Sequence, residues 1–109
     1  MTRRTFLALR NSPLRGRSGP IQVTFVPSDG DDTARVAFAI SKKCGGAVQR
    51  NLIRRRLRSA AGEILVDHPP GSYLVRTGPE AGDSSYQELF ESLSEGLEKV
   101  SRKSKEVTA

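Results

Sequence analysis

The hydrophobic period of this chain changes from two residues to a helical repeat near Ala47, and that change limits the possible folds more than any other feature. Residues 20–27 and 33–41 alternate apolar and other side chains, which predicts two strands. The apolar face of the first strand consists of Ile21, Val23 and Phe25. Because the turn-forming stretch SDGDD joins the two segments, we expect them to pair antiparallel over a core.

From Ala47 to about Val66 the apolar residues return at helical spacing. With about 100° between successive residues they share one stripe, which predicts the core face of a helix. The members of this stripe are Ile53, Leu57, Ala60, Ala61 and Ile64.

Three further segments are shorter than this helix. Residues 3–11 predict a helix, residues 12–20 (SPLRGRSGP) a loop rich in Gly, Pro and Arg, and residues 72–77 a third strand. From the length of the chain we expect residues 1–103 to form a single domain of ordinary size and residues 104–109 to be a frayed tail.

A last helix is expected to begin at Ser84 or Ser85, since Ser85 and Glu88 have the spacing of a capping box. Further residues at helical spacing are Tyr86, Leu89, Leu93, Leu97 and Val100. Together the elements predict an α+β fold, a small sandwich in which helices cover a sheet.

The charges are divided unevenly along the chain. Residues 1–58 contain thirteen Lys and Arg against three Asp and Glu, whereas residues 59–109 contain five against nine. Such asymmetry indicates an electrostatic partner, and scarce aromatic anchors favour nucleic acid over an anionic membrane. No stretch approaches the roughly 18 apolar residues of a membrane span, and no obligate protein partner is evident.

No enzyme active site and no metal site can be recognised in the sequence. It has no phosphate loop and no Ser/His/Asp set in a known frame. Cys44 is the only cysteine, which fits a reducing cytosol; a buried side chain is favoured over a reactive thiol. His68 is the only histidine, and a solvated loop side chain is favoured over a ligand or general base.

The basic part of the long helix is the strongest functional signal. Arg50, Arg54 and Arg58 stand four residues apart, flanked by Asn51 and Arg55, with no acid between Ser41 and Ala60. Like charges at this spacing repel one another, and arginine favours paired contacts with phosphate. The preceding loop adds Lys42, Lys43 and Gly45. Charge alone does not separate RNA from DNA.

The stretch SKKCGGAVQRNLIRRRLR resembles the signature of the bacterial ribonuclease P protein component: Lys-Lys, Gly, Ala-Val, any residue, Arg-Asn-Arg, any residue, Lys/Arg-Arg, two residues, Arg. Leu52 stands where the signature has its second arginine. Phe6, the acidic turn, the SYLVR strand and the last helix also follow the family's order, so the resemblance covers nearly the whole chain. The matching positions are Lys42, Lys43, Gly45, Ala47, Val48, Arg50, Asn51, Arg54, Arg55 and Arg58.

The resemblance implies a cytoplasmic, RNA-binding accessory subunit of an endoribonuclease. Its partners would be a large catalytic RNA and the 5′ leader of precursor tRNA, which the RNA removes with bound Mg²⁺. No side chain of this chain would be catalytic, and no cofactor would be bound by a recognisable protein site. The implied fold is α-β-β-β-α-β-α on a mixed sheet, with a left-handed crossover into the last strand.

The resemblance also implies roles for individual residues. The matched cations and Asn51 would face the RNA subunit, while Phe6, Gln22 and Thr24 would line the leader cleft. Phe6 is equally compatible with a core position, and the family often has an aromatic residue on the strand that carries Gln22 and Thr24. At Leu52 we expect a lost RNA contact, for which Arg56 partly substitutes. Two alternatives remain: a general RNA-binding or ribosome-associated module, and a nuclease whose chemistry lies in this chain.

Overall fold

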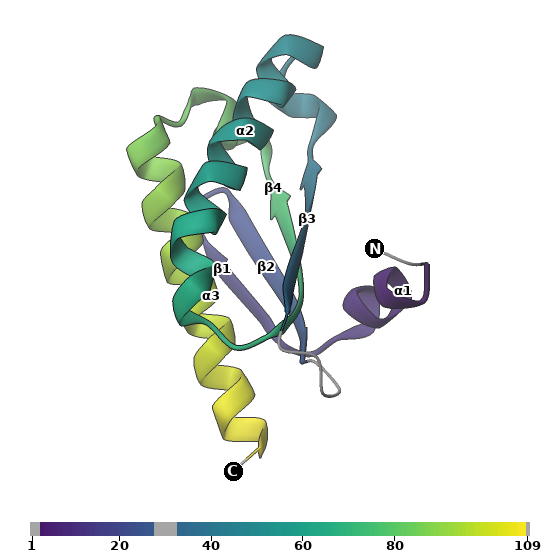
Figure 1. Ribbon diagram of the computed structural model, residues 1–109. Helices are drawn as coiled ribbons and strands as arrows, with labels where there is room; N and C mark the ends of the chain where they lie inside the picture. Colours follow the sequence, from purple (N-terminus) through teal and green to yellow (C-terminus); the bar gives the residue numbers. More distant parts are fainter. Residues whose placement is uncertain (1–2, 28–32, 109) are drawn as a thin grey trace.

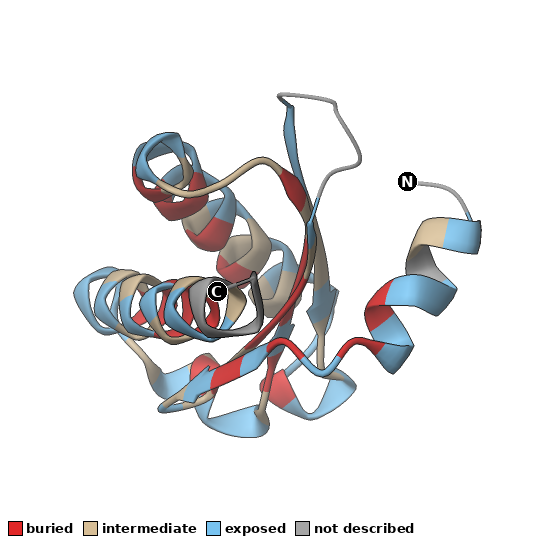
Figure 2. Ribbon diagram, turned by 90° about the horizontal axis from the view of Figure 1, so that it is seen from below, coloured by how far each residue is buried: buried red, intermediate tan, exposed pale blue. Residues whose placement is uncertain are grey.

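A four-stranded mixed sheet forms the centre of the computed structural model, which describes residues 3–27 and 33–108 apart from the side chains of Phe6 and residues 105–108. Two long helices cover one face of this sheet, and a short helix lies on the other (Figures 1 and 2). The fold is α+β, as predicted from the sequence. The predicted turn SDGDD, residues 28–32, lies outside the described residues.

The helices and strands follow one another in the order helix, three strands, helix, strand, helix. Three short 3-10 turns, η1 (Lys42–Cys44), η2 (Leu65–Asp67) and η3 (Pro79–Asp83), lie beside the ends of the larger elements. The larger elements are α1 (Arg3–Asn11), β1 (Arg15–Ser18), β2 (Ile21–Pro27), β3 (Ala34–Ile40), α2 (Ala47–Ile64), β4 (Gly71–Thr77) and α3 (Tyr86–Thr108).

The strand order in the sheet is β1-β2-β4-β3, with β4 antiparallel to β2 and parallel to β3. The predicted direct pairing of residues 20–27 with 33–41 is therefore wrong, because β4 lies between the two strands. The central position suits β4, whose Tyr73 and Val75 are about 1% exposed and whose Tyr73 ring stacks on Phe25 at 4.5 Å. The left-handed sense of the crossover from β3 to β4 stays a prediction.

Strand β1 lies inside the segment predicted to be a loop, residues 12–20. The sequence RGRS has no apolar alternation, so no side-chain pattern indicated a strand. The strand instead forms by pairing with β2 and packing against α3. The packing is close at Gly16, where a Cβ atom would lie 2.5 Å from the carbonyl oxygen of Gly96.

The main core lies between the sheet and the two long helices. All five residues of the predicted α2 stripe are buried, which confirms the helical period of that segment. In α3 the predicted apolar residues Leu89, Leu93, Leu97 and Val100 are buried as well. Tyr86 is 37% exposed and contacts Phe90 instead, because it occupies the first turn, beyond the edge of the core.

The start of α3 is capped as the sequence predicts. The Ser85 backbone N–H donates to Glu88 Oε1 at 2.9 Å, and the Glu88 N–H donates to Ser85 Oγ at 3.1 Å. Hydrogen bonding to the carboxylate from the Ser85 backbone and, to a lesser extent, from its side chain lowers the pKa of the Glu88 carboxyl. The helix continues to Thr108, and the fraying expected of residues 104–109 stays a prediction.

Candidate nucleic-acid interface

Helix α2 carries a row of arginines on the flank next to its buried stripe. Arg50 and Arg54 are half-buried, whereas Arg55 and Arg58 are exposed. The Arg54 guanidinium donates to Asn51 Oδ1 at 3.2 Å, which fixes the Asn51 amide on the exposed side of the helix. Arg50 Nε is buried and has no hydrogen-bond partner in the described chain. The exposed guanidinium groups of Arg55 and Arg58 have no hydrogen-bond partner among the described residues, so these are the donors that the flank offers to an external partner.

The opposite flank of α2 is held against the segment that precedes α3. Gln49 Nε2 donates to the Gly82 carbonyl at 2.9 Å, and Arg56 Nη1 donates to the Ser84 carbonyl at 3.3 Å. Leu52 is half-buried in the same helix. Arg56 can therefore substitute for an arginine missing at position 52 only if it leaves the Ser84 carbonyl.

The loop before α2 is anchored to the end of β4, and its lysines face outward. Cys44 is 6% exposed and its thiol donates to the Gly78 carbonyl at 3.2 Å, which confirms the buried interpretation of this side chain. Lys42 and Lys43 are exposed in η1. Gly45 has a φ of 134°, a conformation that favours glycine, so it turns the chain into α2.

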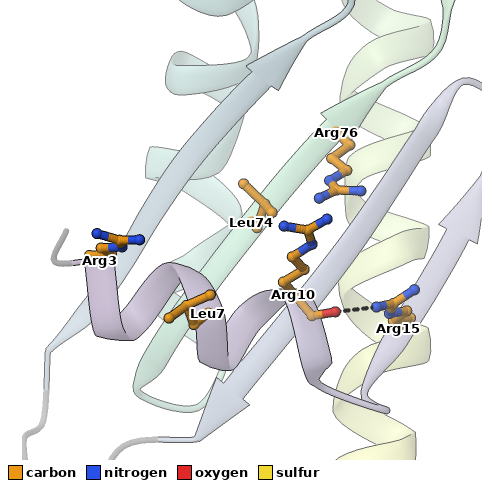
Figure 3. Close-up of a pocket in the computed structure, with 6 residues that line it drawn as sticks. All are labelled: Arg3, Leu7, Arg10, Arg15, Leu74 and Arg76. Atoms are coloured by element: carbon orange, nitrogen blue, oxygen red, sulfur yellow. Dashed lines mark hydrogen bonds between the residues drawn. The ribbon is translucent and has the colours of Figure 1, made fainter.

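A cleft of about 520 Å³ lies on the other face of the sheet, between α1 and the strands. Figure 3 shows the guanidinium groups of Arg10 and Arg76 side by side in this cleft, with Arg3 on the β3 side and Arg15 on the β1 side. None of the described lining residues is acidic, so an anion would relieve the repulsion between these cations. The lining residues are Arg3, Leu7, Arg10, Arg15, Leu74 and Arg76.

The wall that α1 forms is fixed at its C-terminal end. The Arg15 guanidinium donates to the carbonyls of Arg10 at 2.6 Å and Ser12 at 3.1 Å, so it binds oxygens that the end of a helix leaves without partners. Ser12 Oγ donates to the Phe25 carbonyl at 2.6 Å. Leu9 is fully buried. These contacts hold α1 over the sheet while Arg3 and Arg10 remain exposed.

The three residues predicted to line the leader cleft are Phe6, Gln22 and Thr24, and the two whose side chains are described differ in exposure. Gln22 is half-buried and lies in register between Arg17 of β1 and Arg76 of β4. Thr24, expected to face outward, is 4% exposed because neighbouring strands flank it and α1 packs over β2. Phe6 belongs to α1, but its side chain lies outside the described residues.

The four arginines of the cleft were missed by the sequence analysis, although two patterns contain three of them. The two-residue period of residues 72–77 places Leu74 and Arg76 on one face of the strand. In the first helix Arg3, Leu7 and Arg10 are spaced by four and three residues, which is one helical face. Neither pattern shows that the two faces meet, because that depends on where α1 crosses the sheet.

His68 follows α2 and was expected to be a solvated loop side chain. In the structure it is half-buried. Burial lowers the pKa of its imidazole, while Asp67 and Glu98 oppose this shift. Its Nδ1 atom has no hydrogen-bond partner in the described chain. Among the described residues, no group of three or more His, Cys, Asp or Glu could hold a metal ion, and no helix is long and apolar enough to cross a membrane.

The fold and these surfaces define a small basic α+β protein with an arginine row on one helix and an arginine-lined cleft on the opposite face of its sheet. Comparison with known families identifies the family to which this protein belongs. The chain belongs to the ribonuclease P family, whose model matches residues 1–101.

Similar proteins agree with this assignment. The ribonuclease P protein component of Thermobifida fusca is 39% identical over 102 residues, 87% of this chain and 69% of the relative. That of Thermus scotoductus is 38% identical over 96 residues, 88% of this chain, and this chain spans 56% of that relative's length.

Solved structures show the same fold. The RNase P protein of Staphylococcus aureus has a TM-score of 0.76 with 21% identity, and the match covers 90% of each chain. That of Thermotoga maritima has a TM-score of 0.75 with 22% identity, and the match covers 92% of each chain.

Proposed function

We propose that this chain is the cytoplasmic protein subunit of a ribonuclease P, which binds the catalytic RNA and the 5′ leader of precursor tRNA. The observation that carries the proposal is the division of α2 into a buried stripe and an adjoining arginine row. The stripe attaches the helix to the sheet, so the row is free to bind without disturbing the core. No acid occurs between Ser41 and Ala60 to neutralise it.

The row and the loop before it supply the contacts to the RNA subunit. Arg54, Arg55 and Arg58 offer forked donors that match phosphate oxygens. Asn51, fixed by Arg54, adds a neutral amide suited to a base edge or a 2′-hydroxyl. The further members of this surface are Lys42, Lys43, Gly45 and Arg50.

The cleft between α1 and the sheet supplies the leader site. Its arginines can bind the phosphates of a single strand, and the exposed Leu7 beside Leu74 offers an apolar surface for a base. Phe6 and Gln22 belong to the same proposal, whereas the buried Thr24 supports the strand rather than the ligand. Because arginines dominate the described lining, binding here depends more on the phosphate chain than on leader sequence.

In this proposal the RNA subunit hydrolyses the phosphodiester bond with its own Mg²⁺. The protein binds both partners and lowers the repulsion between two polyphosphates that must approach each other. It contributes no catalytic side chain.

Cleavage of precursor tRNA at modest Mg²⁺ tests the proposal, with the chain alone, the RNA subunit alone and both together. We expect little cleavage by the chain alone and a large gain from the combination. Cleavage by the isolated chain would instead support a nuclease, and RNA binding without any gain would support a general RNA-binding module.

A double variant tests the arginine row. Arg54→Ala with Arg58→Ala should weaken binding to the RNA subunit and lower the salt slope of log K by about 2, while the cooperative melt remains. Arg4→Ala, on the exposed side of α1, is the control and should leave that binding within about twofold. Loss of the cooperative melt in the double variant would show that the row belongs to the core.

A further inference from the structure

A second group of cations lies where β1 meets the C-terminal half of α3. A pocket of about 400 Å³ is lined there by Gly16, Arg17, Lys99, Arg102 and Lys103. Four of these five residues are cationic and none is acidic, although residues 59–109 carry a net negative charge. We call Arg17, Lys99, Arg102 and Lys103 the β1–α3 patch.

The fold brings these side chains together through the close contact between β1 and α3. Without a Cβ atom, Gly16 allows the strand to approach the helix backbone at Gly96. Lys99 Nζ then donates to the Arg17 carbonyl at 2.8 Å, and Lys103 Nζ donates to the Arg15 carbonyl. Both lysine ammonium groups are thereby held at the outer edge of the strand.

The two arginines of the patch differ from its lysines. Lys99 also pairs with Glu95 at 3.4 Å, so part of its charge is neutralised. The side chains of Arg17 and Arg102 are exposed, and neither guanidinium group makes a hydrogen bond or ion pair within the described parts of the chain. Glu98 lies one helical turn before Arg102 but forms no ion pair with it there. The guanidinium groups are therefore available to an external anion.

The patch continues from the leader cleft along the sheet. Arg76, Gln22 and Arg17 lie in register on β4, β2 and β1, so they form one row across the face that α1 covers in part. Neighbouring strands are about 4.8 Å apart, which places Arg17 roughly 10 Å beyond Arg76. The row leads from the cationic cleft to the patch without an acidic side chain between them.

The direction of this path follows from the arrangement of the helices. Figure 3 shows Arg3 at the β3 end of the cleft and Arg15 at the β1 end. Strand β3 adjoins α2, which carries the arginine row, while β1 adjoins α3. A leader that enters from the side of the bound RNA subunit therefore leaves the cleft toward β1.

We propose that the β1–α3 patch binds phosphates of the leader nucleotides that lie beyond the cleft, on the 5′ side. This inference rests on the proposed function and adds a second leader site to it. Arg17 and Arg102 make the contacts to the phosphates. Gln22 lies on β2, between the cleft and the patch, under the path of the leader. Contacts to the phosphate chain make this site indifferent to leader sequence and sensitive to leader length and salt.

The test uses the holoenzyme assembled from this chain and its RNA subunit. Precursor tRNAs with leaders of about 4 and about 12 nucleotides, which span the usual size of single-strand sites, are compared for binding and cleavage. For the longer leader, Arg17→Gln with Arg102→Gln should lower the salt slope by about 1.4 and the affinity by about 10-fold near 0.15 M salt. For the shorter leader the loss should stay below about twofold.

Arg4→Gln is the matched control for charge, and thermal unfolding of each variant checks the fold. An equal loss with both leaders would place the patch on the RNA subunit or the tRNA body and overturn the inference. An unchanged affinity for the longer leader would overturn it as well. Failure of the wild-type chain to stimulate cleavage at all would instead refute the proposed function, and the second leader site with it.

Discussion

Replacing Gly16 by alanine should separate β1 from α3. The added Cβ would lie 2.5 Å from the Gly96 carbonyl oxygen, 3.0 Å from Lys99 Cβ and 3.1 Å from Val100 Cγ2. Because the nearest atom belongs to the backbone of a helix, no side-chain rotation can relieve the overlap. Overpacking of this kind costs about 1–3 kcal/mol, and the displaced strand also loses the lysine contacts at its carbonyls.

The same substitution also has a stabilising effect, which is smaller than the cost of the overlap. Alanine reduces the entropy of the unfolded chain, which stabilises a protein by about 0.4–1 kcal/mol where the native conformation permits it. The net expectation is a loss of about 2 kcal/mol. For a domain of this size that corresponds to a Tm lower by roughly 9 °C, measured by circular dichroism and checked by urea unfolding.

Gly62→Ala is the matched control, since it makes the same chemical change on the exposed side of α2. No atom lies within 4 Å of the added Cβ, and alanine is the better helix former by about 1 kcal/mol. This variant should therefore raise the Tm by a few degrees. A Gly16→Ala protein that melts at or above the wild-type temperature would refute the close contact between β1 and α3.

Three further predictions concern single side chains. Leu52→Arg should tighten binding to the RNA subunit and steepen the salt slope by about 0.9; an unchanged slope would contradict a lost contact at this position. Ser85→Ala removes the cap of α3 and should cost about 1 kcal/mol in urea unfolding, whereas Ser94→Ala, in the middle of that helix, should cost less. Burial lowers the pKa of His68 below its value in the unfolded chain, so the unfolded state binds the extra proton first. The stability that the neutral imidazole contributes is present above about pH 6.5 and is lost as the pH falls, so His68→Gln should flatten the decline of Tm below pH 6.5; an unaltered decline would assign it to other groups.

The helices were predictable because their own residues determine them. The α2 stripe from Ile53 to Ile64 and the Ser85 cap depend on spacings of a few residues, which remain visible in a single sequence. Tyr86 shows the limit of that approach, since periodicity assigns a face to a residue but does not show where the neighbouring element ends.

The sheet was less predictable, because its pairing joins residues far apart in the chain. The insertion of β4 between β2 and β3 depends on competition for the central position, and no local spacing records it. Strand β1 lacked any apolar pattern because its place is set by α3. The same reason explains the candidate site: the α2 row could be predicted from one helix, whereas the cleft combines α1, β1 and β4.

The two lysines of α3 have a consequence for the outer edge of the sheet. An edge strand normally offers free carbonyl groups on which a strand of another molecule can pair. In β1 the carbonyls of Arg15 and Arg17 already accept hydrogen bonds from Lys103 and Lys99, and the charged ammonium groups lie where a further strand would have to approach. This edge is thereby protected from extending into a continuous sheet with further copies of the chain.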